Sequence, residues 1–524
     1  MHVEGGDDFF RRPPSPFCNH EVSMNSTPSY WSEASGREYP ALDKPLSVDV
    51  AVIGGGITGL MAAYLLQRDG ATVVVLEKNR VVSGESGRTT AHLTYKSDST
   101  LRELSSKFGA DHAAASWDGQ AAAIETLHET IHREGIGCRF RWVPGYYHAP
   151  MEGEPDLEEL RGEAETAKEH GFDVKFAESV PFLNRPGVAF ARQAQFHPAE
   201  FLHGLAAALE TKGRVVYEQT EATDFPDEGS LVANGHRIEA GAIILATHVP
   251  LQARMATLPA TVFQTKIHPY TSYVVRGTLP GSDAEPALFW DSNDPYDYLR
   301  IDEEDGQRFA ILGGLDRKTG QEEAGFDPYA ALTAKLKRLA PNARITHRWA
   351  GQVVETDDGL PFIGEVGHRQ FIATGYAGNG FTFGTLAAMI LADRIAGRTN
   401  PWADLFDPHR SAVKRGLRDY IAENVDYPYY MAKRLFQRGS KEGPEKLARG
   451  EGALISLGGK RLAVCRDSAG TLHRLAPECT HMGCLVNWNE PLQSWDCPCH
   501  GSRFAPDGAV ISGPAEKPLE AVAD

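Results

Sequence analysis

Short apolar runs separated by glycine-rich turns mark the start of the main part of the chain. Residues 48–53 and 71–76 are apolar at most positions, which is typical of strands buried on both faces of a parallel sheet. Between them lie a glycine turn and a mostly apolar stretch, residues 59–69, with the length of a helix. The order strand, glycine turn, helix, strand predicts one half of a nucleotide-binding α/β domain.

A different pattern follows later in the chain. Runs such as residues 271–276 and 287–291 are typical of antiparallel strands, and we expect them to form a sheet over about residues 264–320 that covers the substrate site. Near the C-terminus, residues 447–524 alternate between apolar and polar positions and suit a small all-β domain. A charged amphipathic stretch before it predicts a helical connector.

These patterns divide the chain into regions with different structures. The start is rich in proline and serine, which predicts a disordered extension, and either Met1 or Met24 can be the first residue. The predicted regions are the extension 1–45, the large domain 46–400, the connector 401–446 and the C-terminal domain 447–524.

Composition excludes some classes of partner. The 524 residues carry a formal net charge of -17 and a pI near 5.6, which argues against affinity for nucleic acid or anionic lipid. No run of eighteen apolar residues occurs, so we expect no transmembrane segment. Cys18, Cys138 and Cys465 are scattered without a pairing pattern, which favours a reducing compartment and a cytoplasmic protein.

Three glycines form a Gly-x-Gly-x-x-Gly motif at the junction of the first strand and helix. Gly54 allows a tight turn, Gly56 lets a pyrophosphate approach the backbone, and Gly59 lets the helix pack on the strand. The helix N-terminus then offers unpaired N–H groups to the anion. Glu77 ends the second strand, where its carboxylate can accept hydrogen bonds from ribose hydroxyls. The motif therefore predicts a dinucleotide site.

Two short boxes near the C-terminus combine cysteine with histidine. In a Rieske-type [2Fe-2S] cluster two thiolates hold one iron and two imidazoles hold the other, so each box must present one cysteine and one histidine. The alternative is a tetrahedral zinc site, which also uses Cys and His at short spacing. The predicted cluster ligands are Cys479, His481, Cys497 and His500.

The Gly-Ser pair that ends the second box, and a later Gly-Pro pair, resemble the cluster-covering loops of respiratory Rieske proteins. The resemblance implies that the remaining cysteines of the boxes, Cys484 and Cys499, form a disulfide between the two loops. It also places the hydroxyl of Ser502 near a cluster sulfur, where a hydrogen bond tunes the reduction potential. Phe504 stands where high-potential members carry a tyrosine, so we expect a potential below about +300 mV, the top of the Rieske range.

Other segments resemble flavoproteins of the D-amino-acid oxidase type, in the order of that family. As a whole, the chain resembles bacterial Rieske-containing FAD-dependent oxidoreductases of the D-amino-acid oxidase superfamily. The resemblance implies an α/β (α+β) FAD-binding Rossmann-like domain with an antiparallel substrate sheet, plus a small all-β Rieske domain. A helix starting near Thr382 would stabilise negative charge on the reduced flavin. The FAD-binding residues implied are Ser86, Gly87, Arg88, Thr89, Thr90, Gly375, Gly378, Gly380 and Thr382.

The superfamily oxidises carbon–nitrogen bonds, so the resemblance implies a small-molecule amine or amino-acid substrate. FAD would take a hydride, and the cluster would pass the electrons on to an external acceptor. Tyr298 and Arg300 fall on one strand face, and Arg300 could bind a substrate carboxylate in bidentate fashion. The alternative for Arg300 is a surface arginine on a solvated strand face. His92 could be a covalent attachment point for FAD, but a packing role is the favoured interpretation.

Two other functions compete with the amine dehydrogenase. A Rieske oxygenase needs a 2-His-1-carboxylate iron domain, so this chain would then serve a separate oxygenase. An electron-transfer protein fed by NADH would need a second nucleotide-binding fold, and only one Gly-x-Gly-x-x-Gly motif of this kind is visible. The sequence therefore favours a dehydrogenase acting on a CH–NH group.

Overall fold

The computed structural model of the chain describes residues 26–225, 229–249, 266–323, 325–410, 424, 426–437, 439–440 and 442–522. The predictions about Cys18 and about the first residue lie outside these residues. Among the described helices, none is long and apolar enough to cross a membrane.

The first large sheet carries the nucleotide-binding strands. β1 (Leu46–Ile53) lies at its centre and runs parallel to β10 (His236–Leu245) on one side and β2 (Val73–Leu76) on the other. β17 (Gln370–Thr374) continues the sheet beyond β10, and β7 (Val216–Tyr217) continues it beyond β2. The antiparallel strands at its margins are β8 (Ala222–Asp224), β9 (Ser230–Ala233) and β16 (Phe362–Gly367).

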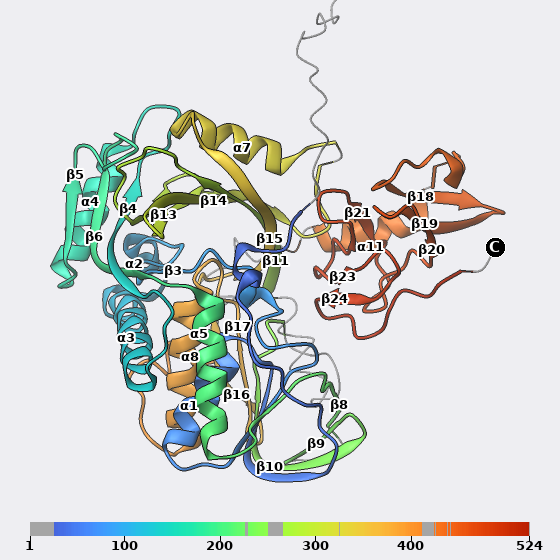
Figure 1. Ribbon diagram of the computed structural model, residues 1–524, viewed down its shortest axis with the longest axis horizontal. Coiled ribbons are helices and arrows are strands. Elements are labelled where there is room, and N and C mark those ends of the chain that lie inside the picture. Colours follow the sequence, from blue (N-terminus) through green and yellow to red (C-terminus); the bar gives the residue numbers. More distant parts are fainter. Residues whose placement is uncertain are drawn as a thin grey trace, which may run out of the picture.

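Side chains of β1 alternate between two apolar cores. Val50 and Val52 belong to the core that the helices cover, whereas Ala51 and Ile53 belong to the core on the opposite face. Burial on both faces explains the almost continuous apolar sequence of this strand. The covering helices are α1 (Ile57–Arg68), α3 (Ala110–Glu134), α5 (Pro198–Leu209) and α8 (Gly380–Ile395) (Figure 1).

The second large sheet is mostly antiparallel. It contains the strands expected between about residues 264 and 320, which are β11 (Ile267–Thr278), β12 (Ala287–Asp291), β13 (Tyr298–Glu304) and β14 (Gln307–Lys318). The sheet is larger than predicted, because β12 pairs in parallel with a strand from far earlier in the chain. The added strands are β3 (His92–Leu93), β4 (Arg141–His148), β5 (Val174–Ala177), β6 (Gly187–Gln195) and β15 (Arg344–Thr356).

The remaining helices of the large domain cover its ends. α7 (Pro328–Leu339) packs on the outer face of the second sheet, where Leu332 and Leu336 are fully buried. The other helices are α2 (Leu101–Phe108), α4 (Leu157–Glu169) and the 3-10 turns η1 (Tyr30–Glu33), η2 (Glu85–Gly87) and η3 (Glu210–Lys212).

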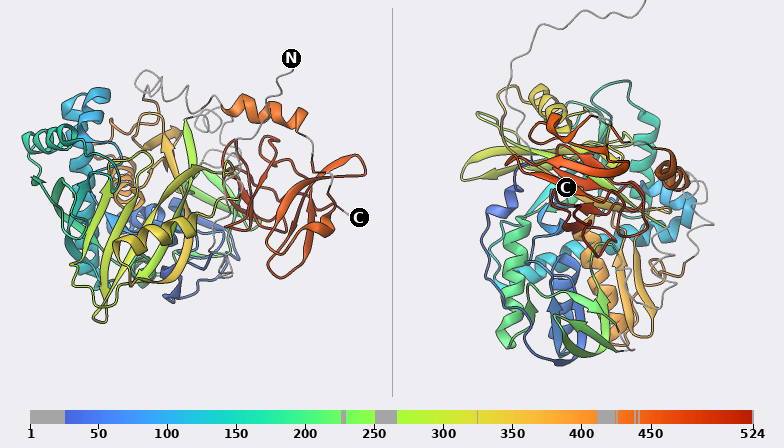
Figure 2. Two further views of the ribbon diagram at one scale, coloured as in Figure 1. Left: turned by 90° about the horizontal axis from the view of Figure 1, so that it is seen from above. Right: turned by 90° about the vertical axis from the view of Figure 1, so that its right-hand side faces the viewer.

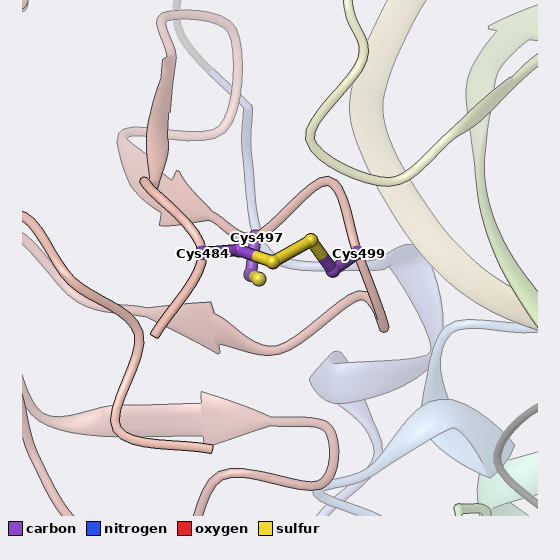
Figure 3. A group of neighbouring side chains, drawn as sticks. All are labelled: Cys484, Cys497 and Cys499. Atoms are coloured by element: carbon purple, nitrogen blue, oxygen red, sulfur yellow. A yellow bond between two sulfur atoms is a disulfide. The ribbon is translucent and has the colours of Figure 1, made fainter. Parts of the chain in front are cut away.

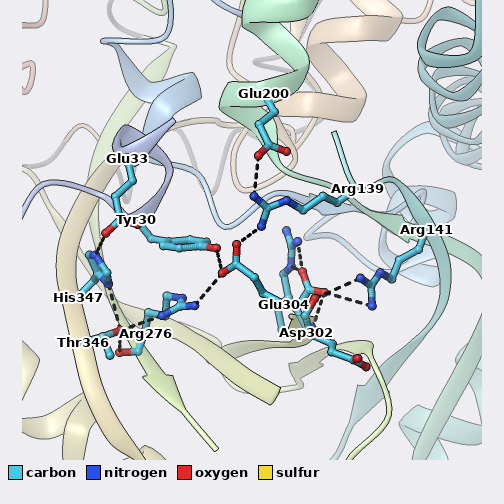
Figure 4. Close-up of polar contacts among 12 residues, drawn as sticks. Tyr30, Glu33, Arg139, Arg141, Glu200, Arg276, Asp302, Glu304, Thr346 and His347 are labelled. Atoms are coloured by element: carbon cyan, nitrogen blue, oxygen red, sulfur yellow. Dashed lines mark hydrogen bonds and ion pairs between the residues drawn. The ribbon is translucent and has the colours of Figure 1, made fainter. Parts of the chain in front are cut away.

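Residues 26–45 are ordered against the large domain, so the prediction of a disordered extension over residues 1–45 is wrong for this part. Trp31 is 1% exposed, and its indole N–H donates to a backbone carbonyl at 2.5 Å. The Tyr30 hydroxyl donates to the carboxylate of Glu304 on β13, as Figure 4 shows. Two large aromatic side chains provide enough apolar burial to hold this segment in place.

The C-terminal domain forms a lobe at one end of the molecule, beside β11 and β15 (Figure 1). Figure 2 shows the same arrangement from two further directions. The C-terminal domain consists of a three-stranded and a four-stranded antiparallel sheet. α11 (Asp426–Phe436) lies in the predicted connector, of which residues 411–423 are outside the described chain. The other elements are η4 (Pro444–Lys446), β18 (Gly452–Leu457), β19 (Lys460–Arg466), β20 (Leu472–Leu475), β21 (Asn487–Asn489), β22 (Ser494–Asp496), β23 (Arg503–Phe504) and β24 (Val510–Ser512).

Candidate active site and cluster-binding loops

A cavity of about 1430 Å³ runs through the large domain and reaches the C-terminal lobe. Its walls include the glycine turn before α1, the inner surface of the second sheet and the segment before α8. Residues 510–513 of the C-terminal domain also line it. The predicted nucleotide site, the predicted substrate sheet and the predicted cluster domain therefore share one cavity.

The glycine turn has the geometry that its sequence predicts. Gly54 has a φ of +112°, a conformation that only glycine adopts without strain, and a Cβ there would lie 2.4 Å from the carbonyl oxygen of Ala246. A Cβ at Gly59 would lie 1.9 Å from the carbonyl oxygen of Gly54. Gly59 thus allows α1 to pack closely on β1, while Gly54 and Gly56 line the cavity.

Glu77 stands at the end of β2 and lines the cavity. Its carboxylate accepts hydrogen bonds from the backbone N–H groups of Gly55 and Asn79, both at 2.8 Å. Burial raises the pKa of Glu77, while these two hydrogen bonds lower it. The carboxylate is held at the edge of the glycine turn, the position that ribose recognition requires.

The second predicted segment lies directly beside the glycine turn. The Ser86 hydroxyl accepts a hydrogen bond from the N–H of Ile57, at the N-terminus of α1, at 3.1 Å. Ser86, Arg88, Thr89 and Thr90 line the cavity. Gly87 does not; a Cβ there would lie 2.0 Å from the carbonyl oxygen of Val82, so this glycine serves close packing.

The segment before α8 supplies another wall. Gly375, Gly378 and Gly380 line the cavity, but Thr382 does not, which corrects its expected role. The helix begins at Gly380, close to the predicted start, and Thr382 lies inside its first turn. Its buried hydroxyl donates to the carbonyl oxygen of Asn379 at 3.2 Å.

This donor set fits FAD. A dinucleotide needs a helix N-terminus for its pyrophosphate, a carboxylate for its ribose and an extended channel for its ring system, and the cavity supplies all three. His92 lines the cavity beside the second segment, where its Nε2 lies 3.3 Å from the carbonyl oxygen of Leu299. Burial lowers the pKa of His92 to about 3 and keeps the ring neutral.

Of the two substrate-binding candidates, only Tyr298 faces the cavity. Its hydroxyl lies 2.7 Å from the Ser272 hydroxyl, and its ring covers Gly313, where a Cβ would lie 2.2 Å from the ring. Arg300 is 1% exposed and forms an ion pair with Asp302, and it also donates to backbone carbonyls, among them that of Phe196 at 2.9 Å.

The prediction that Arg300 binds a substrate carboxylate is therefore wrong. All of its hydrogen bonds in the structure go to protein groups on the same face of β13 as Tyr298, where Arg300 is buried and does not line the cavity. The same side of the sheet carries further ion pairs, of which those of Arg139, Glu200 and Glu304 are shown in Figure 4. This network holds the sheet to its neighbours and leaves the cavity without this arginine.

The two cysteine and histidine boxes form tight loops side by side. Cys479 and Cys497 are buried, and their thiols form a hydrogen bond with one another. The imidazole rings of His481 and His500 have centroids 4.8 Å apart. One cysteine and one histidine from each loop therefore converge on the same small volume, as a Rieske cluster requires.

The protonation of these side chains also fits the cluster. The hydrogen bond with Cys497 lowers the pKa of Cys479 to about 7, and the same bond raises the pKa of Cys497. Burial lowers the pKa of His481 to about 4 and that of His500 to about 3, so both rings are neutral at pH 7. Neutral imidazoles and an ionisable thiol pair are the ligands of this cluster type.

Cys484 and Cys499 are joined by a disulfide across the two loops (Figure 3). The sulfur of Cys497 lies within 4.8 Å of both. These three cysteines do not make a separate metal site, because disulfide sulfurs are not thiolates. The disulfide instead links the loop of His481 to the loop of His500.

The second cluster loop packs directly on the large domain. The Gln352 side-chain N–H group donates to the carbonyl oxygen of Gly501 at 2.9 Å, and Asn487 donates to the carbonyl oxygen of Gly320 at 2.7 Å. A Cβ at Gly320 would lie 2.6 Å from the backbone of Cys497. At Gly320 the backbone of the large domain therefore meets the backbone of the cluster loop directly.

Several candidate functional residues were not predicted from the sequence. Asp98 and Asp316 both line the cavity. His268 also lines it and hydrogen bonds to Asp357 at 2.8 Å. His268 also acts on the cluster loops, because its charge adds to the effects of burial and of His481 in lowering the pKa of His500. No local motif marks these residues, because they come from separate segments that only the fold brings together.

The fold and the cavity define a flavoprotein oxidoreductase that carries an iron–sulfur domain of its own. The family model described as FAD dependent oxidoreductase matches residues 49–394, and the model of the Rieske [2Fe-2S] domain matches residues 442–523. The chain thus belongs to the FAD-dependent oxidoreductase (DAO) family, with a C-terminal Rieske domain, and its cofactors are FAD and a [2Fe-2S] cluster. This excludes zinc as the metal of the two boxes.

Known proteins resemble the chain over different lengths. YhfW of Bacillus subtilis (strain 168), whose name describes a Rieske 2Fe-2S iron-sulfur protein, is 30% identical over 96% of this chain and 99% of its own. Gamma-glutamylputrescine oxidoreductase of Escherichia coli (strain K12) is 25% identical over 73% of this chain and 92% of its own. The crystal structure of glycine oxidase from Geobacillus kaustophilus, 22% identical, superposes with a TM-score of 0.57 over 70% of this chain and 99% of that chain.

Proposed function

We propose that this protein oxidises a small amine or amino acid at its C–N bond. Electrons would then pass from FAD to the Rieske cluster, and from the cluster to an external acceptor. In this proposal FAD accepts the two electrons of the substrate as a hydride, and the cluster takes them one at a time. The amine oxidoreductase named among the relatives supports the substrate class.

The observation that carries the proposal is the contact between cavity and cluster domain. Residues 510–513 line the same cavity as the glycine turn, and the loop of His500 packs on the cavity wall at Gln352. Packing of this kind favours transfer inside one chain over transfer between two proteins, because the two sites are already side by side.

Different residues of the chain would bind the flavin, the substrate and the cluster. Glu77 and the glycine turn would hold the nucleotide half of FAD, and the second segment around Ser86 would meet its pyrophosphate. Tyr298 would line the substrate side of the ring. The cluster would be held by Cys479, His481, Cys497 and His500.

An anaerobic titration tests the proposal. The purified protein is mixed with a panel of amines and amino acids, while flavin bleaching and the low-temperature EPR signal of the reduced cluster are followed together. Bleaching by one substrate with a parallel rise of the cluster signal supports the proposal. Reduction by NADH alone, with no response to any amine or amino acid, would replace it with an electron-transfer relay that serves a separate redox partner.

A further inference from the structure

Two carboxylates face each other across the substrate end of the cavity. Asp98 accepts hydrogen bonds from the Tyr296 hydroxyl at 2.8 Å and from the N–H of Gly378 at 3.0 Å. It therefore joins the second sheet's side of the cavity to the segment that would meet the flavin ring. Asp316, on β14, accepts a hydrogen bond from the Ser272 hydroxyl.

The two carboxylates belong to one electrostatic unit. Burial raises the pKa of Asp316 to about 7, against the lowering effect of the Ser272 hydroxyl, and the charges of Asp98 and Asp297 add to the increase. Tyr296 and Tyr298 lie between the acids, with ring centroids 5.9 Å apart. Carboxylates flanked by aromatic faces are a typical environment for an organic cation.

Two lysines nearby are already bound to protein groups. Lys335 forms an ion pair with Asp297, and the ammonium group of Lys96 donates to the backbone carbonyl of Asp98 while it lies 4.4 Å from the Tyr147 ring centre. Within the described residues, neither Asp98 nor Asp316 forms an ion pair with a lysine or arginine.

Further charges line other parts of the cavity wall. Arg317 and Lys318 follow Asp316 on β14, and Arg317 is exposed. On the other side, Asp291 is the last residue of β12 and is itself buried. Burial, with the charge of Asp297, raises the pKa of Asp291 to about 6. The substrate end of the cavity is therefore richer in carboxylates than in free cations.

An α-amino acid would need the opposite arrangement. Its carboxylate, bonded to the same carbon as the nitrogen, calls for an arginine beside the reacting carbon. The arginine that the sequence suggests, Arg300, is bound to Asp302 and does not line the cavity. A second carboxylate placed next to Asp98 and Asp316 would be repelled by both.

We propose that the substrate is a cationic amine with no carboxylate on the carbon that bears nitrogen, bound with Asp316 as its counter-ion and proton acceptor. This inference rests on the proposed amine oxidation and narrows its substrate class. Asp98 adds negative charge and holds the flavin-side wall through Gly378. Tyr296 and Tyr298 enclose the alkyl part of the substrate.

The proton balance follows from this arrangement. The ammonium group loses one proton to the Asp316 carboxylate, which becomes a neutral acid, and the amine nitrogen regains its lone pair. The C–H bond next to nitrogen then breaks, and its hydrogen leaves with both electrons as a hydride to FAD. The product is an iminium ion, which water hydrolyses to a carbonyl compound and an ammonium ion, or the protonated form of a smaller amine.

Dead-end ligands test binding apart from turnover. tert-Butylammonium has no hydrogen on the carbon that bears nitrogen, so it binds without being oxidised, and pivalate is its carboxylate counterpart. Binding to the holoenzyme is measured by calorimetry and by perturbation of the flavin spectrum. We expect tert-butylammonium to bind and pivalate not to bind. The substitution Asp316→Asn should lower the affinity for tert-butylammonium at least about tenfold, because it removes a charged hydrogen-bond partner.

A matched control separates this effect from a general change of charge. Asp305→Asn removes a carboxylate from an exposed turn of the same sheet, at a φ of +50° that asparagine tolerates, and should leave binding unchanged. If Asp316→Asn does not fold, the native protein still tests the inference. Binding of tert-butylammonium should then strengthen as the pH rises from 6 to 8, where Asp316 ionises and the ligand keeps its charge.

The possible outcomes test the cationic substrate separately from the proposed oxidation of a C–N bond. Bleaching by propylamine and not by 2-aminobutyrate, which differs by one carboxylate, supports both. Bleaching by 2-aminobutyrate in preference, or binding of pivalate in place of the cation, overturns the cationic substrate and leaves C–N oxidation standing. Cation binding that is indifferent to both Asp316→Asn and pH overturns the role of Asp316. No bleaching by any amine or amino acid overturns both proposals.

Discussion

The hydroxyl of Ser502 connects two of the loops around the cluster site. It accepts a hydrogen bond from the N–H of Ala515 at 3.1 Å and hydrogen bonds to the sulfur of Cys479. Reduction adds negative charge to the cluster and its sulfurs, so a donor to sulfur stabilises the reduced state more than the oxidised state. Phe504 is fully buried and has no hydroxyl to add a second such bond.

Replacing Ser502 with alanine should therefore lower the reduction potential of the cluster. A hydrogen bond of about 1 kcal/mol corresponds to about 40 mV for a one-electron centre. The potential is measured by a redox titration followed by EPR. The control is Ser494→Ala, which removes a buried hydroxyl bonded to Asp496 and not to sulfur, and which should leave the potential unchanged. Equal shifts in both variants would contradict the prediction.

Residues whose role depends on neighbours in the sequence were predictable. Residues whose role depends on groups far away in the chain were not. The cluster boxes carry their spacing within a few residues, and Gly54 is recognisable because its turn requires a positive φ. Arg300 was misjudged, because the groups that bind it, such as the carbonyl of Phe196, lie about a hundred residues away in the chain. Asp98 and Asp316 meet only in the folded protein, so no sequence window contains both.

At the scale of elements, one buried ion pair ties the end of β15 to the segment after α8. The guanidinium of Arg410 donates to both carboxylate oxygens of Asp358, at 2.8 and 2.9 Å, and to the carbonyl of Pro361 at 2.8 Å. Asp358 is fully buried. The turn held in this way includes Asp357, which bonds to His268, and Gly359, which lines the cavity.

Replacing Arg410 with methionine should destabilise the protein by about 3–5 kcal/mol, because it leaves the charge of Asp358 buried without a partner. Thermal denaturation of the holoenzyme measures the loss. Arg398→Met is the matched control, since Arg398 is 47% exposed and pairs with Asp69 and Asp393 at the surface. Such surface pairs contribute about 0–1 kcal/mol. A loss for Arg410→Met no larger than for the control would show that the pair is not essential.

The elements themselves were predictable to different degrees. The strand and helix around the glycine turn were recognisable because their apolar pattern and their glycines agree with each other. The start of α8 near Thr382 was predicted only to within a turn, because the residue before the helix, Asn379, makes no side-chain capping bond that would mark its exact start. The parallel pairing of β12 with β4 left no local signal, since it joins segments far apart in the chain.

At the scale of the whole molecule, the cluster domain is seated on the large domain by close backbone contact at Gly320. Its φ is +82°, and a Cβ there would lie 2.6 Å from the backbone of both Cys497 and Pro498. Gly325 has a similar φ of +78°, but nothing lies within 4 Å of its missing Cβ. The two glycines therefore share the same backbone strain on substitution and differ only in the contact with the cluster loop.

Replacing Gly320 with alanine should push the cluster loop away and slow electron transfer from flavin to cluster. The clash adds about 1–3 kcal/mol to the strain that Gly325→Ala also carries. Stopped-flow mixing with substrate under anaerobic conditions measures both steps, through flavin bleaching and the cluster signal of quenched samples. In Gly320→Ala the flavin should bleach at the normal rate while cluster reduction lags, and Gly325→Ala should show no lag. A lag in neither variant would count against transfer through this interface.

The same interface carries a pH-dependent contact. Burial, together with the charge of Asp496 in the cluster domain, raises the pKa of Glu322 in the large domain to about 8, against the lowering effect of Arg503. The folded protein thus holds a proton on Glu322 that the unfolded chain releases near pH 4.5. By linkage, its contribution to stability is full below about pH 4.5 and falls by about 1.4 kcal/mol per pH unit until the pH reaches the folded pKa.

Glutamine keeps the acceptor that the N–H of Gly320 uses at 3.2 Å but cannot ionise. Glu322→Gln should therefore resemble the native protein in melting temperature near pH 5 and exceed it near pH 8, by about 4 kcal/mol in unfolding free energy. Melting curves of both proteins across this range measure the difference. Because other titrating groups are common to both, a constant gap at every pH would mean that Glu322 does not titrate against Asp496. A gap that widens with pH would show that ionisation of Glu322 destabilises the contact between the large domain and the cluster domain, which is also the contact that electrons would cross.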